Sequence, residues 1–303
     1  MNRETVSDSG NDASSDSAWQ RFRVRLMYTL PHHLLSAAMH TSTRIRARAW
    51  KNWQINWFIQ RYRVDMDIAQ RRSPEDFEHF NAFFTRALNA EARPVCMQPD
   101  AVACPADGAI SACGPIDGDS IFQAKGQRFS LTQLLGGDQA RAKEFIGGQF
   151  CTIYLSPRDY HRVHMPVAGT LREMVHVPGR LFSVNPLSAR MVPGLFARNE
   201  RVVSIFDGDA GPFAVVMVGA VFVGSIEQVW AGEVAPASTR SVTSTTYPAA
   251  SSTASLHLDK GEEMGRFNMG STVIVILPPS AVRWRSDLSP GTPVSLGEMI
   301  AVA

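Results

Sequence analysis

Three short stretches of the sequence carry residue types that can do chemistry. Residues 105–108 contain Asp107, residues 156–166 hold His161 and His164 three positions apart, and the third stretch is the pair Gly270-Ser271. An aspartate, a histidine and a serine can form a triad in which histidine is the base, aspartate orients it and serine is the nucleophile. Each stretch also has an ordinary structural use, because Asp-Gly is common in turns and Gly-Ser often precedes a strand.

Two other kinds of site are disfavoured. The paired histidines have no evident third ligand, whereas zinc sites use three or four, so we expect no metal. An α/β-hydrolase is disfavoured because the G-x-S-x-G pattern does not occur. The cysteines form neither a C-x-x-C pair nor a zinc pattern, and we expect ordinary buried thiols at all of them: Cys96, Cys104, Cys113 and Cys151.

The elements that must position these residues are mainly strands. From about residue 95, short apolar runs alternate with turn signals rich in Gly, Pro and Asp, and residues 273–277 are typical of a core strand. Helical patterns are few: residues 131–135, residues 186–196, and a helix that begins at Ser73-Pro74 and packs its phenylalanines on the core. Residues 238–255 are expected to form a mobile loop. The prediction is an α+β fold with an antiparallel β-rich core, barrel- or sandwich-like, and N-terminal amphipathic helices.

The first 72 residues divide into two parts. Residues 1–18 are polar and are expected to be a disordered tail. Residues 19–72 carry eleven Arg and Lys against two Asp, and Trp50, Trp53 and Trp57 share one helical face. This composition is typical of a membrane-associating helical segment on an anionic surface. The alternative is that the tryptophans pack on the core and the arginines are solvated. A nucleic-acid partner is not expected, because no recognition motif accompanies the arginines.

Length and composition fit one large folded unit after this segment. The chain has 303 residues, of which 45% are hydrophobic, and a net charge of only +2. No stretch has the pattern of a secretion signal or a transmembrane helix. We therefore expect residues 73–303 to form the catalytic β-rich domain.

Taken together, the motifs resemble the phosphatidylserine decarboxylase family of bacterial type. The resemblance runs in order through eight stretches, namely residues 80–86 (FNAFFTR), 104–108 (CPADG), 129–136 (FSLTQLLG), 154–166 (YLSPRDYHRVHMP), 181–185 (LFSVN), 196–202 (FARNERV), 218–227 (VGAVFVGSIE) and 265–273 (GRFNMGSTV). One departure is Met269, where the family usually has leucine, and this swap conserves volume.

The resemblance implies a proenzyme that cuts itself and then decarboxylates phosphatidylserine to phosphatidylethanolamine and CO2. Carried onto this sequence, Ser271 attacks the Gly270 carbonyl, and the chain is cut into residues 1–270 and 271–303. Ser271 then becomes a pyruvoyl cofactor, whose carbonyl forms a Schiff base with the substrate amine. His164 takes the Ser271 proton and is oriented by Asp107, while His161 returns a proton to the product carbon.

The resemblance also implies where the protein works. Its partner is phosphatidylserine in an anionic membrane surface, so the enzyme is expected as a peripheral protein on the cytoplasmic face of the cell membrane. The two chains would stay together as one protomer, and a homodimer is left open. The alternatives are a pyruvoyl decarboxylase of a soluble amino acid and a non-catalytic lipid-binding protein. The Trp- and Arg-rich segment argues against the first, and the combination of Asp107, His164 and Gly270-Ser271 argues against the second.

Overall fold

A nine-stranded antiparallel sheet forms the middle of the molecule. The computed structural model describes residues 19, 28, 31–221, 225–235, 240–268, 271–279 and 282–302. The tail of residues 1–18, expected to be disordered, lies outside these residues, as does most of 19–30. The main path through the sheet joins eight strands in the order β12 (Thr243–Thr246), β7 (Gly169–Val177), β8 (Arg201–Gly208), β9 (Gly211–Val218), β15 (Ser271–Leu277), β5 (Gln149–Leu155), β2 (Gly108–Pro115) and β17 (Pro293–Val294), and the ninth strand, β13 (His257–Leu258), pairs with β7.

Strand β15 lies in the middle of this sheet, between β5 and β9. All seven of its residues are buried. Successive side chains of a strand point to opposite faces, and here Ile274 and Ile276 enter one apolar core while Val273 and Val275 enter another. A strand with a core on both faces must be apolar throughout, which explains the uninterrupted run from residue 273 to 277.

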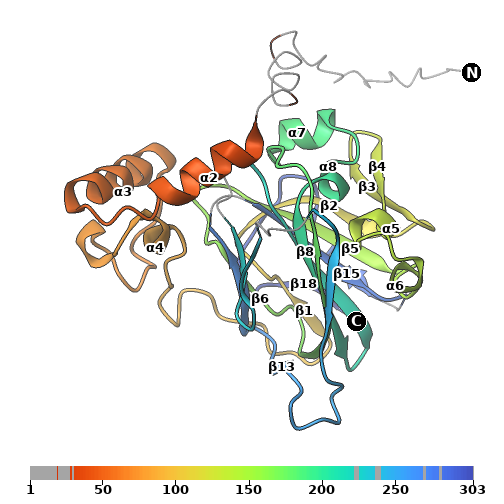
Figure 1. Ribbon diagram of the computed structural model, residues 1–303. Helices are drawn as coiled ribbons and strands as arrows, with labels where there is room; N and C mark the ends of the chain where they lie inside the picture. The colour runs from red at the N-terminus through yellow and green to blue at the C-terminus, as the bar shows by residue number, and fades with distance from the viewer. Residues whose placement is uncertain are drawn as a thin grey trace, which may run out of the picture.

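The two cores separate three layers (Figure 1). One face of the large sheet is covered by four short helices and a hairpin, namely α5 (Leu131–Leu134), α6 (Gln139–Lys143), α7 (Pro186–Met191), α8 (Leu195–Arg198), β3 (Ser120–Ala124) and β4 (Gln127–Ser130). The other face is covered by two smaller sheets, of order β11 (Gly232–Ala235), β10 (Ile226–Gln228), β14 (Glu263–Phe267), β6 (Arg162–His164) and of order β1 (Ala101–Ala103), β18 (Met299–Val302), β16 (Arg283–Trp284).

The N-terminal helices form a separate apolar cluster beside these layers. Helix α3 (Arg48–Tyr62) buries Ile55 and Phe58 against the phenylalanines of α4 (Phe80–Phe84), and α2 (His32–Ser42) precedes it. The opposite side of α3 leaves Trp50, Trp53 and Trp57 41%, 58% and 52% exposed. Core packing therefore does not account for these three tryptophans. No helix in the described part of the chain has both the length and the apolar character that crossing a bilayer requires.

The predicted fold class is confirmed, with three local differences. The described strands form no closed barrel, since the large sheet ends at β12 and β13 on one side and at β17 on the other. The helix expected from Ser73 is a single 3-10 turn, η1 (Pro74–Asp76), followed by extended Phe77 and then by α4. A capping box closes this turn on itself, and phenylalanine is a modest helix former, so the helix does not propagate.

The third difference concerns residues 238–255, expected to be a loop. Part of this stretch is β12, which pairs with β7 over four residues. The β-branched threonines of β12 suit a strand, and β7 would otherwise present an unpaired edge. Residues 236–239 lie outside the described part of the chain.

Candidate active site

Ser271 begins the central strand β15 and is completely buried. It pairs with Leu155, the last residue of β5. Its Oγ atom has no hydrogen-bond partner among the described residues. Buried polar atoms are usually paired, so an unpaired hydroxyl at this position is free to react rather than committed to holding the fold. Gly270 lies outside the described residues, and the geometry of the predicted scissile bond is therefore not part of this description.

The chain that leaves Leu155 leads directly to the two histidines. A turn then brings the chain to β6. The Asp159 carboxylate holds this turn by accepting hydrogen bonds of 2.7 Å from both the backbone N–H and the hydroxyl of Ser156. Strand β6 pairs with β14, and the Phe267 N–H donates to the His161 carbonyl at 3.0 Å. His161 therefore lies opposite a residue four positions before Ser271.

Both histidines are held in the same tautomer. The Nδ1–H of His161 donates to the Asp159 carbonyl, and that of His164 donates to the Gly261 carbonyl, each at 2.8 Å. A carbonyl can only accept, so Nδ1 carries the proton and Nε2 carries the lone pair in both rings. The Nε2 atom of His164 lies 3.4 Å from the Tyr160 hydroxyl, while that of His161 is buried without a partner among the described residues.

Burial keeps both rings neutral. It lowers the pKa of His164 and lowers the pKa of His161 to about 3, where the positive charge of Arg86 adds to the effect. The His161 ring also packs against Phe84, with the ring centroids 4.1 Å apart. A neutral imidazole whose Nε2 carries the lone pair is a proton acceptor, so both rings have the tautomer that taking a proton from a serine hydroxyl requires.

Asp107 is held next to β6, but its carboxylate is occupied by an arginine. The backbone N–H of His164 donates to the Pro105 carbonyl at 2.8 Å, which joins the Asp107 turn to β6. Arg93 binds the carboxylate with two hydrogen bonds of 2.7 Å, and the Leu296 N–H donates to it at 2.8 Å. Among the described residues no hydrogen bond joins Asp107 to His164, and the predicted orienting contact stays a prediction.

Glycine is required after Asp107 for a steric reason. A Cβ atom at Gly108 would lie 2.4 Å from the Tyr154 carbonyl oxygen of the neighbouring strand β5. The Asp-Gly pair is thus a turn residue followed by a glycine that lets β2 approach β5 closely, which agrees with the structural interpretation of the motif.

Sequence reasoning missed the residues that surround these groups. Arg93 stands outside the three motifs, although it is the bidentate partner of Asp107. Tyr160 stands inside the histidine motif, and burial raises the pKa of its phenol to about 12, which keeps it protonated beside His164. Position within the motif was a usable signal for Tyr160, but nothing in the spacing pointed to Arg93.

A buried hydrogen-bond network lies just before Ser271 and was also missed. Asn268 accepts from the Asn81 side chain at 2.9 Å, and its own side-chain amide donates to the Ser225 hydroxyl. Ser225 donates to Glu233 at 3.0 Å, and Glu233 forms an ion pair with Arg44, which follows α2. This network connects the N-terminal helices with the segment that leads into Ser271.

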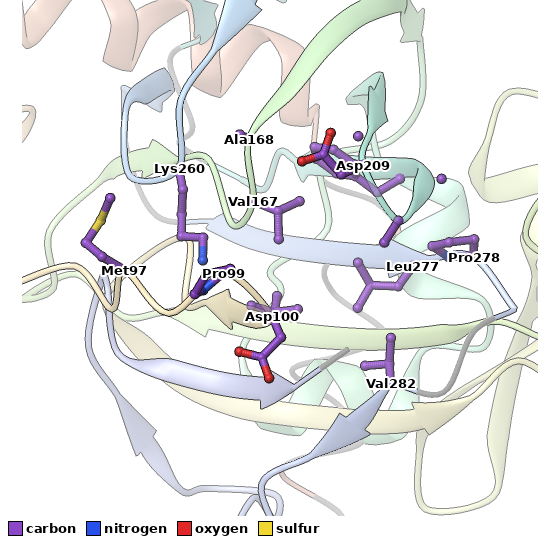
Figure 2. A pocket seen from close by; sticks show the side chains of 15 residues that line it. Met97, Pro99, Asp100, Val167, Ala168, Asp209, Lys260, Leu277, Pro278 and Val282 are labelled. Carbon is purple, nitrogen blue, oxygen red and sulfur yellow. The ribbon is translucent and has the colours of Figure 1, made fainter.

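A cavity lies at the other end of β15, away from Ser271 (Figure 2). It has a volume of about 280 Å³ and is lined largely by apolar side chains, among them Val167, Phe213 and Leu277. The charged end of Lys260 in its wall is held by the carbonyls of Gln98 and Ala101 at 2.6 and 2.8 Å. The length of β15, six steps at roughly 3.3 Å each, separates this cavity from Ser271 by ~20 Å.

Comparisons with known proteins agree with the motifs. The profile of the phosphatidylserine decarboxylase family matches residues 80–302, and a profile described as PSD matches residues 22–63. The chain is 58% identical over 275 residues to a phosphatidylserine decarboxylase proenzyme of Bordetella petrii, which covers 91% of this chain and 95% of that protein. It is 55% identical over 284 residues to the proenzyme of Ectopseudomonas mendocina, covering 94% and 99% of the two chains, and 57% identical over 282 residues to that of Pseudomonas entomophila, covering 93% and 98%.

Proposed function

The chain belongs to the phosphatidylserine decarboxylase family, and from this premise we propose which of its residues carry out the reaction. It is a decarboxylase that converts phosphatidylserine to phosphatidylethanolamine and CO2, and it is made as a proenzyme that processes itself. The observation that carries the proposal is the buried, unpartnered Ser271 hydroxyl at the start of the central strand. A decarboxylase of a soluble amino acid is disfavoured, because the relatives are named for phosphatidylserine.

In the proposed self-cleavage, the Ser271 hydroxyl loses its proton to a histidine Nε2 and its oxygen attacks the Gly270 carbonyl carbon. The C–N bond between residues 270 and 271 breaks, and an ester takes its place. Elimination of the ester and hydrolysis, with release of ammonia, leave a pyruvoyl group at position 271. Strand β15 is paired on both sides and β18 is paired with β1, so residues 271–303 stay bound after the cut.

The pyruvoyl group fits this position, because the hydroxyl consumed in making it holds no other group in place. When formed, the group supplies an electron sink for the loss of CO2. The protein's own residues hold and move protons around it. In the proposed assignment His164 accepts the proton of Ser271, and Asp107 stabilises the charge that develops on His164. His161 takes up a proton from water at Nε2 and passes it to the product carbon.

One observation favours the reverse assignment of the two histidines. His161 lies opposite Phe267, four residues before Ser271, whereas His164 pairs with Glu263, eight residues before it. Among the described residues, the Nε2 of His161 is also the one of the two that has no partner. In this second candidate His161 is the base for self-cleavage, and His164 serves the later proton transfer.

Denaturing mass spectrometry of the purified protein separates these assignments. The wild type should give two chains, one ending at Gly270 and one with a blocked residue at position 271. His164→Gln should stay uncut if His164 is the base, while His161→Gln should cut and then fail to turn over. The opposite pattern would establish the second candidate. A single intact chain in a protein preparation that decarboxylates phosphatidylserine would refute the pyruvoyl proposal itself.

The N-terminal helices are proposed to hold the enzyme as a peripheral protein on an anionic membrane surface, on the cytoplasmic face of the cell membrane. Support comes from the exposed side of α3, where Trp50, Trp53 and Trp57 stand beside basic residues such as Arg46 and Arg61. Indole rings suit the interface, and each basic residue near an anionic surface contributes about 1 kcal/mol. Vesicle co-sedimentation of the wild type and of a Trp50, Trp53 and Trp57 triple alanine variant tests this, and unchanged binding would refute it.

A further inference from the structure

Four arginines line a cavity between the helical segment and the small sheet that holds the histidines. They are Arg71 after α3, Arg86 after α4, Arg162 in β6 and Arg266 in β14. The cavity has a volume of about 360 Å³, and its lining contains no acidic residue. One water molecule occupies roughly 30 Å³ in the liquid, so a phosphate group has ample room here.

The charges around this arginine cavity do not balance within the described part of the chain. Glu263 pairs with Arg162 at 2.7 Å and with Arg266 at 3.1 Å, and Glu227 lies 3.7 Å from Arg266. Described carboxylates form no ion pair with the other two arginines. Arg71 donates to the Asp76 carbonyl and Arg86 to the Arg158 carbonyl, each at 3.3 Å. In direct ion pairs, two glutamates thus face two of the four arginines, and Arg71 and Arg86 pair with no described carboxylate.

Arg86 is the least satisfied of the four. Only 3% of its surface is exposed, and its Nε atom has no hydrogen-bond partner among the described residues. Its guanidinium lies 5.5 Å from the centre of the Phe83 ring. Holding a buried guanidinium that no carboxylate contacts directly is costly, so a site that keeps one is suited to an anion that supplies this contact.

The neighbouring cavity shows that this imbalance is local. It shares Arg86, has a volume of about 240 Å³ and also contains four arginines, but three aspartates stand among them: Arg63, Arg86, Arg93 and Arg158 face Asp65, Asp107 and Asp159. In that cavity the aspartates fall short of the arginines by one. The lining of the arginine cavity beside it holds four arginines and no acidic residue.

The arginine cavity also adjoins the candidate active site. Arg162 directly follows His161, and Arg266 directly precedes Phe267, whose N–H binds the His161 carbonyl. From the other side, Gln70 and Arg71 come from the segment of residues 19–72 that carries the exposed tryptophans, and Phe77 follows shortly after it. An anion bound here would contact both the helical segment and the strands around the histidines.

We propose that the arginine cavity is a binding site for a phosphate group. Guanidinium groups bind phosphate oxygens through paired, charge-assisted hydrogen bonds, and four of them surround this space. The group can come from the headgroup phosphodiester of a lipid or from free phosphate. The lipid source rests on the proposed function, whereas the phosphate site itself does not depend on it.

The test uses full-length Ser271→Ala protein, so that neither self-cleavage nor turnover enters the result. Inorganic phosphate is titrated by calorimetry, and co-sedimentation is measured with vesicles of phosphatidylcholine alone and of phosphatidylcholine with phosphatidylglycerol. The added variants are Arg71→Gln, whose residue is exposed and tolerant of change, and Arg266→Gln. Arg72→Gln is the matched control, because Arg72 is exposed on the same segment but does not line the cavity.

We expect each cavity variant to weaken phosphate binding on the order of tenfold relative to Arg72→Gln, as loss of a charge-assisted hydrogen bond predicts. Weakened binding of inorganic phosphate supports the site with free phosphate as ligand. Weakened binding only of vesicles that contain phosphatidylglycerol supports it with a lipid headgroup as ligand. If both cavity variants match Arg72→Gln in every arm, the proposal is overturned, whatever the outcome of the self-cleavage experiments.

Discussion

Ser271 and Leu277 stand at opposite ends of β15, and both side chains are buried. At the Ser271 end the surrounding chain supplies a hydroxyl without a partner and a histidine whose Nε2 is also unpaired among the described residues. At the Leu277 end the cavity wall is mostly apolar (Figure 2). Lys260 in this wall is held by two carbonyls. Burial is common to both ends, so burial does not define the candidate reactive end. The Ser271 end differs because its buried hydroxyl and imidazole have polar atoms without a hydrogen-bond partner among the described residues.

The largest expected effect comes from removing the Ser271 hydroxyl. Ser271→Ala should leave the chain uncut and abolish decarboxylation, because one residue supplies both the nucleophile and the precursor of the cofactor. Gel electrophoresis under denaturing conditions and release of CO2 from phosphatidylserine measure both effects.

Ser204→Ala is the matched control for that variant. Ser204 in β8 is also a fully buried serine of the same sheet whose Oγ has no described partner, but it belongs to neither end of β15. It should cut and turn over like the wild type. If Ser204→Ala also stays uncut, the comparison fails, because any buried hydroxyl of this sheet would then matter equally.

The middle of β15 should govern stability without governing chemistry. Ile276 is fully buried in the core beneath the covering helices, and Ile276→Ala should lower the free energy of unfolding by about 2–5 kcal/mol. Denaturant titration in the uncut Ser271→Ala background measures this. Below its unfolding transition, Ile276→Ala with Ser271 intact should still cut itself; loss of cutting in a folded variant would show that the two ends are not separable.

The Ser271 end should also make stability depend on pH. The pKa of His161 is lowered to about 3 in the folded chain, against 6.5 for an ordinary histidine, so between these values only the unfolded chain takes up the proton. The stability that the folded chain retains by keeping His161 neutral is therefore fully present above about pH 6.5 and is lost as the pH falls towards 3. Between pH 7 and pH 5 it amounts to about 2 kcal/mol.

Denaturant titrations of Ser271→Ala at pH 7 and pH 5, with and without His161→Gln, isolate this effect. The variant without the imidazole should lose less stability over the interval by about 2 kcal/mol. An equal loss in both proteins would mean that His161 is not the group that resists protonation.

The smallest effect is expected at the Leu277 end. Val167→Ile adds one methylene to the wall of the apolar cavity and should stabilise the chain by less than about 1 kcal/mol, with cutting and turnover unchanged. Thermal unfolding and the activity assay measure the two quantities. A marked change in turnover would show that this cavity communicates with Ser271 along β15.

Much of the fold was predictable where a pattern is local. The apolar run of residues 273–277 predicted a core strand, and the prediction is confirmed by β15. The prediction failed where neighbours decided the outcome. Residues 243–246 became a strand because β7 offered an edge, and the segment after Ser73 stopped after one turn because its own side chains satisfied its backbone.

The sequence by itself determined which groups are candidates for the reaction: Asp107, His161, His164 and Ser271 were singled out by residue type and by motif. Only the tertiary structure decided the partners of these groups. Arg93 binds the Asp107 carboxylate, and two backbone carbonyls fix the tautomers of the two histidines. Four arginines from distant segments line one cavity. The reason is physical: a side chain's chemistry is carried by its own atoms, but its hydrogen bonds and its charge balance depend on which distant residues the strand pairings bring within reach.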